Sequence, residues 1–142
     1  MRRVRVVVSV SAGDVAAQGQ VPGPLSNEQR SDLARVVQAA REVSGYAFAV
    51  RIGSLSAGRD SALDHHKALA VPNSSILVAV DPTARRIEIV TGSTVARVVE
   101  DRTAEFAALA MASCFVANDL VGGVREGVTL LAEHARRSSR PD

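Results

Sequence analysis

Ser75-Ile-Leu-Val-Ala-Val-Asp-Pro-Thr-Ala-Arg-Arg-Ile-Glu-Ile-Val-Thr91 is the stretch that decides the fold of this chain. Its five consecutive apolar residues, 76–80, predict a strand that is buried on both faces. A turn should follow, because Pro82 presets φ at the second turn position and Asp81 can accept hydrogen bonds from downstream amides. Residues 87–89 alternate apolar, acidic and apolar side chains. We therefore expect a returning antiparallel strand with one face less deeply covered.

The size of the chain fits one domain with a real core, because 142 residues are 46% hydrophobic. No apolar run approaches the roughly 20 residues of a membrane span. The single cysteine, Cys114, excludes an intramolecular disulfide and favours a reducing, cytoplasmic location. Met1–Val10 is rich in β-branched residues and predicts an added strand. A short secretion signal is the alternative for this segment, because basic residues precede its apolar run.

Helical periodicity surrounds the central hairpin. A capping box at Ser26–Gln29 opens a first helix, and Gly45 is placed to end it. A strand at about 46–52 and a short helix at about 60–69 precede the hairpin, so strand, helix and strand predict a parallel pair. We expect an α/β fold, in which a small mixed sheet is sandwiched by about four helices. The predicted division is an N-terminal strand and loop extension (1–24), a single domain (25–137) and a polar tail (138–142).

Two helices are expected after the hairpin, at about 100–116 and 119–136. Each should turn an apolar stripe towards the sheet. The stripe predicted for the first of them is Phe106, Leu109, Ala110 and Phe115, and that for the second is Val124, Val128, Leu131 and Ala132.

Several of these segments together resemble the TPM domain, the thylakoid-lumen acid-phosphatase-like family. The resemblance rests on Pro24-Leu25-Ser26 with Glu28, the strand 48–52, Val80-Asp81 followed by 86–89, and the glycine-containing helix start 122–127. It covers about Leu25 to Ala135 in element order and suggests a divergent bacterial member. It implies an α/β sandwich. Metal binding (often Ca²⁺) and phosphatase activity are attributed to some members of that family, and accessory or assembly roles to others.

The chain departs from the TPM pattern at its acidic loop. Family members usually carry Gly-x-Gly-(Leu)-Glu after the second hairpin strand, with an Asp further on. Here Thr91-Gly92-Ser93-Thr94 keeps the first glycine and lacks the second glycine and the glutamate. Asp101 matches the later Asp, and Glu100 precedes it. The resemblance therefore implies a depleted carboxylate site.

Asp81, Glu100 and Asp101 are the candidate ligands for a divalent cation, Ca²⁺ or Mg²⁺, with Asp119 as a further candidate. Carboxylates at loop and element ends are the ligands that hard cations prefer. Local roles explain the aspartates as well: Asp81 as a turn residue, Asp101 in the first turn of a helix and Asp119 as an N-cap. We favour these local roles, and expect no cofactor.

The histidines and the cysteine give weaker signals. His65 and His66 are adjacent on a predicted helix and point about 100° apart, so they make a poor chelate. We expect them on an exposed or half-buried helix face. Cys114 lies among apolar residues of a predicted helix and is interpreted as inert core.

The charge pattern bears on partners. Seventeen basic and fifteen acidic residues are interspersed, with no Trp and one Tyr, so nucleic-acid binding is not expected. Arg85-Arg86 and Arg136-Arg137 could contact phosphates, with Arg86 as the candidate, but we favour ordinary solvated charge for these pairs. Two hypotheses remain: a non-enzymatic module that binds or assembles with a protein partner, which we prefer, and a weak metal-dependent acid-phosphatase-like hydrolase. The sequence leaves open whether the protein is an enzyme.

Overall fold

The sheet is mixed and has the predicted hairpin at its centre. The structure, a computed structural model, describes residues 5–11 and 25–139. Four strands lie in the order β1-β4-β3-β2, and β2 runs parallel to β3 while the other neighbours are antiparallel. The bounds of the strands are β1 (Arg5–Ser11), β2 (Ala47–Ile52), β3 (Ser75–Asp81) and β4 (Arg86–Thr91). The expected N-terminal strand is therefore confirmed, and it pairs with β4.

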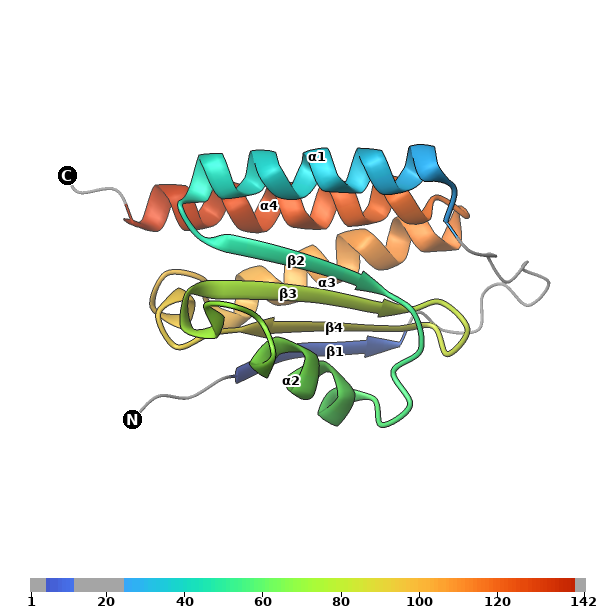
Figure 1. Ribbon diagram of the computed structural model, residues 1–142, viewed down its shortest axis with the longest axis horizontal. Helices are drawn as coiled ribbons and strands as arrows, with labels where there is room; N and C mark the ends of the chain where they lie inside the picture. The colour runs from blue at the N-terminus through green and yellow to red at the C-terminus, as the bar shows by residue number, and fades with distance from the viewer. Residues whose placement is uncertain (1–4, 12–24, 140–142) are drawn as a thin grey trace.

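The helices cover both faces of the sheet, as a sandwich requires. They are α1 (Asn27–Ser44), α2 (Arg59–Lys67), α3 (Asp101–Val116) and α4 (Leu120–Ser139), with short 3₁₀ turns η1 (Pro72–Ser74) and η2 (Val95–Arg97). Helix α2 lies on one face, and α1, α3 and α4 gather on the opposite side (Figure 1). This arrangement confirms the predicted α/β class. Within the described residues, no helix is both long enough and apolar enough to cross a membrane.

Strand β3 is the centre of the core, because every one of its residues is buried. Ile76, Val78 and Val80 pack into the large cluster shared with α1, α3 and α4. Leu77 and Ala79, which alternate with them, pack into a smaller cluster under α2. The uninterrupted apolar run is thus explained by helices on both sides of the strand.

Strand β4 is more deeply buried than the alternation predicts. Glu88 is fully buried, although one face of this strand was expected to be less covered. That expectation is wrong for a structural reason. Strand β1 pairs with the outer edge of β4, and α2 packs over the face that carries Glu88, so β4 is an interior strand.

The ends of α1 follow from local chemistry. The Ser26 hydroxyl accepts a hydrogen bond from the Gln29 amide at 3.0 Å, and the Gln29 side chain accepts one from the Ser26 amide at 2.9 Å. Both bonds of the predicted capping box are therefore present. Gly45 ends the helix with φ of 84°, in the left-handed region that a glycine adopts without strain.

Helix α3 turns a different face to the core from the one predicted. Phe106 and Leu109 are 61% and 60% exposed, and Ala110 and Phe115 are half-buried. The buried face consists instead of smaller side chains and one methionine, namely Ala104, Ala107, Ala108 and Met111. The helix is apolar nearly all round, so periodicity alone does not select the buried face.

The reason for this rotation lies in α4, whose predicted stripe of Val124, Val128, Leu131 and Ala132 is buried as expected. A Cβ atom at Gly123 would lie 2.6 Å from Phe115 Cε1, and one at Gly127 would lie 2.6 Å from Met111 Cγ. The two helices are therefore closely packed at these glycines, where a larger residue in α4 would clash with Phe115 or Met111.

Replacing Gly127 with alanine should destabilise the protein. Alanine normally favours a helix by about 0.8–1.0 kcal/mol over glycine. Here its methyl group would displace the fully buried Met111, so we expect a net loss of about 1–2 kcal/mol in the free energy of unfolding. Urea denaturation measures it. Gly53→Ala is the control, because a Cβ there meets nothing within 4 Å. A Gly127→Ala variant that is more stable than the wild type would contradict the close packing.

Candidate functional site

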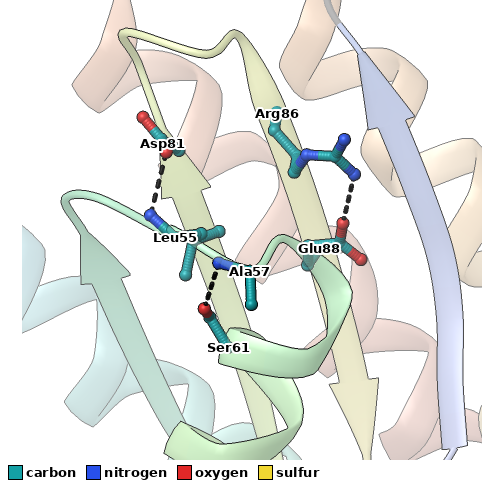
Figure 2. A network of polar contacts seen from close by, with 6 residues as sticks. All are labelled: Leu55, Ala57, Ser61, Asp81, Arg86 and Glu88. Carbon is teal, nitrogen blue, oxygen red and sulfur yellow. Dashed lines mark hydrogen bonds and ion pairs between the residues drawn. The ribbon is translucent and has the colours of Figure 1, made fainter.

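Asp81 ties the end of the central hairpin to the loop that leads into α2. One carboxylate oxygen accepts a hydrogen bond from the Leu55 amide at 2.8 Å, and the other accepts one from the Ala84 amide at 3.1 Å. Figure 2 shows Asp81 at the end of β3, with its carboxylate directed at the Leu55 amide. The second bond is the turn role proposed from sequence. The first joins segments that are far apart in the chain.

The structure does not bring Asp81 together with Glu100 and Asp101. Asp81 precedes β4, whereas Glu100 and Asp101 follow it, and a six-residue strand is about 20 Å long. Asp101 lies in the first turn of α3, as the local interpretation predicts, and Glu100 precedes that turn without a capping bond from its side chain. In the part of the chain that the structure describes, no three His, Cys, Asp or Glu side chains group as a metal site would require.

Asp119 caps α4. Its carboxylate accepts a hydrogen bond from the Gly122 amide at 2.9 Å. Helix α3 has 16 residues, which is about 24 Å, and it separates Asp119 from Asp101. These two aspartates therefore lie at opposite ends of one helix, each in a local role.

A partly buried ion pair, which sequence patterns did not indicate, lies on the face of the sheet that α2 covers. The Arg86 guanidinium donates to the carboxylate of Glu88 at 3.0 Å, and the Glu88 side chain is fully buried (Figure 2). Arg86 also lies against the start of α2, since a Cβ at Gly58 would be 3.4 Å from its guanidinium carbon. Arg86, the candidate for a phosphate contact, thus has a structural partner within its own strand.

His66 departs from the expected exposed or half-buried position. It is fully buried, whereas His65 beside it is half-buried. The Nε2 atom of His66 lies 3.1 Å from the Ser75 carbonyl oxygen, so Nε2 carries the hydrogen. Nδ1 is buried without a hydrogen-bond partner among the described residues. Burial lowers the pKa of His66 below its usual 6.5, and the bond to Ser75 opposes that shift in part. His66 is thus a neutral core residue of α2.

Cys114 is half-buried at the contact between α3 and α4 rather than fully in the core. Its Sγ lies 3.8 Å from a carboxylate oxygen of Glu126. Desolvation, followed by the negative charges of Glu126 and Asp119, raises the pKa of the thiol. The inert role predicted for Cys114 agrees with this raised pKa, because the thiolate is the reactive form.

A groove of about 1000 Å³ lies where the parallel strands β2 and β3 end. Helix α1 forms one wall with Leu33, Ala34 and Val37, and the second half of β2 forms the other. The turn after Asp81 closes one end. Ligands of open α/β sheets bind beside the carboxyl ends of the strands, which makes this groove a candidate binding site. The sequence could not indicate this groove, because its walls come from segments far apart in the chain.

Replacing Asp81 with alanine should lower the free energy of unfolding by about 1–3 kcal/mol, because the buried Leu55 amide would lose its acceptor. Asp101→Asn changes an exposed residue and should cost less than about 1 kcal/mol. Urea denaturation compares the two variants. A cation site at these acids would give a different result. Ca²⁺ or Mg²⁺ would raise the melting temperature of the wild type but not of either variant, because a cation bound only to the native state stabilises it.

His66 should make stability fall in acid. Its folded pKa is below 6.5, so the unfolded chain binds a proton first as the pH falls, and the native state loses stability from about pH 6.5 downwards. Above about pH 6.5, His66 is neutral in both the folded and the unfolded state, and its contribution to the pH dependence of stability vanishes. A single proton contributes at most about 1.4 kcal/mol per pH unit. His66→Leu should lose less stability than the wild type between pH 7.5 and 5.5, whereas His65→Leu should behave like the wild type. Equal losses in all three proteins would rule out His66 as the cause.

Comparison with known proteins gives a family and no activity. A model described as domain of unknown function (DUF5130) matches residues 4–132, which include β1 and most of α4. No curated protein matches the chain. Nothing in the family match identifies a TPM domain, so the resemblance drawn from the sequence is not supported by it. The chain belongs to the DUF5130 family.

Proposed function

We propose that this DUF5130 domain is a non-enzymatic protein-binding module, and that a partner docks in the groove between α1 and β2. The observation that carries the proposal is the groove itself, which has a volume of about 1000 Å³ and an apolar wall of Leu33, Ala34 and Val37. Its position beside the ends of parallel strands, together with mostly apolar walls, is typical of binding sites.

The described residues that line the groove offer little that could catalyse a reaction. Arg30 and Asp81 are the charged residues among the described lining, and both carboxylate oxygens of Asp81 already accept hydrogen bonds from backbone amides. Ser54 and Thr83 supply hydroxyls, and the described lining residues include no histidine or second acid that could act as their base. A metal-dependent hydrolase is the alternative, and the groove holds one of the three acids that it would use.

The outer face of α3 also supports a protein-binding role. Phe106, Leu109 and Val116 are all more than half exposed, and they recur at the spacing of an apolar helix seam. Exposed large apolar side chains that lie together mark surfaces for contact with other proteins.

Selection of a peptide library on the immobilised protein tests the groove. Ala34 and Ala39 are both exposed on α1, and only Ala34 lines the groove. Peptides selected on the wild type should bind Ala34→Glu at least about tenfold more weakly, a loss of about 1.4 kcal/mol. They should bind Ala39→Glu with unchanged affinity, because glutamate is well tolerated in helices.

Two results would overturn the proposal. One is that no peptide is enriched, or that every enriched peptide binds Ala34→Glu as well as it binds the wild type. The other is hydrolysis of a phosphate monoester that Asp101→Asn abolishes while its melting temperature is unchanged, because that result would favour the hydrolase.

A further inference from the structure

In the part of the chain that the structure describes, no strand pairs with the edge of the sheet that borders the groove. Among the described residues, β2 is the outer strand and pairs with β3 alone. The Gly53 amide donates to the Val80 carbonyl oxygen at 2.9 Å, so it points inward. Amide direction alternates along a strand, and Arg51 therefore points inward as well. Val50 and Ile52 direct their amide and carbonyl groups away from β3, towards the groove that they line.

Two chemically different surfaces flank this edge. On the side of α1, a chain lying in the groove would meet Leu33, Ala34 and Val37. On the other face of the sheet, the side chain of Arg51 is exposed. Helix α2 packs on β3, β4 and β1, so it leaves Arg51 uncovered. Arg30 adds a second positive charge from α1. Neither arginine forms an ion pair with another residue in the described part of the chain.

We propose that the groove binds an extended peptide in which apolar and acidic residues alternate, and that this peptide adds to the sheet as a further strand beside β2. The proposal rests on the proposed function and names the ligand of the same groove. Side chains of an extended peptide point alternately to opposite faces. Apolar residues would then pack against α1, and acidic residues would lie on the side of Arg51.

An extended chain fits the groove better than other ligands do. The outward groups of Val50 and Ile52 need donors and acceptors at strand spacing, and an extended backbone supplies both. A helix satisfies its own backbone groups and would leave those of β2 without partners. An acyl chain would fill the apolar wall but brings no donor for the carbonyl groups of the edge.

A blocked hexapeptide of alternating valine and glutamate is the probe, and isothermal titration calorimetry on the full chain measures its binding. We expect the parent peptide to bind the wild type and Ala39→Glu equally, and Ala34→Glu at least about tenfold more weakly. Replacing its glutamates with lysines should reduce the affinity by a similar factor. Arg51→Gln should weaken binding of the parent peptide, whereas Arg35→Gln, which changes an exposed arginine paired with Asp32, should not.

N-methylation separates strand addition from simple docking. One peptide carries N-methyl groups on its valines and another carries them on its glutamates. Only one set of amides can face β2, so one methylated peptide should lose binding and the other should keep most of it. Equal affinities of both methylated peptides and the parent would overturn strand addition. Docking of the peptide in the groove would still stand if Ala34→Glu weakened the binding of these peptides.

If the parent peptide does not bind while peptides from the library bind in the groove, the proposal of an alternating apolar and acidic ligand is wrong. If no peptide of either origin depends on Ala34, the proposed function fails too.

Discussion

Strand β3 is buried on both faces, and this constraint organises the rest of the protein. A strand without a solvent face needs a cover on each side. Helix α2 supplies the cover on one side, and α1, α3 and α4 supply it on the other. The crossover that carries the chain from β2 to β3 places α2, so the parallel pair and the smaller core arise together. The groove then lies beside β2, which is one of the two outer strands of the sheet in the described part of the chain and pairs with β3.

Local chemistry made much of this fold predictable. The apolar run before Asp81, the capping box at Ser26 and the left-handed Gly45 each determine structure through neighbours in sequence. The stripe on α4 was also readable, because its polar face is strongly charged and marks the side exposed to water. These elements were predicted because a short segment contained the necessary information.

The predictions of side-chain exposure that were wrong concern residues whose surroundings come from segments distant in the sequence. Phe106 faces water because the glycines of α4 let that helix pack closely on the side of α3 that carries Met111 and Phe115, a contact that periodicity in α3 alone does not reveal. Glu88 is buried because β1 and α2 enclose β4. His66 is buried because α2 packs on β3. In each case tertiary packing, rather than propensity, decided the exposure.

In the candidate site, too, features set by neighbours in sequence were predicted and those set by tertiary packing were not. The turn bond of Asp81 was predicted, whereas its bond to Leu55 spans 26 residues and was not. The acids proposed as cation ligands share a position at element ends, but β4 and α3 carry those ends apart. The groove, which now carries the functional proposal, has walls from α1 and β2 and was invisible in the sequence.

Amide hydrogen exchange along β2, followed by NMR, tests most directly whether this edge is open. We expect the exchange rates to alternate: the amides of Val50 and Ile52 exchange fast in the free protein, while those of Arg51 and Gly53 are protected by β3. A bound strand should then slow the exchange of Val50 and Ile52. Strong protection of all four amides in the free protein would contradict strand addition at β2, because the edge would already be paired and no partner could add to it.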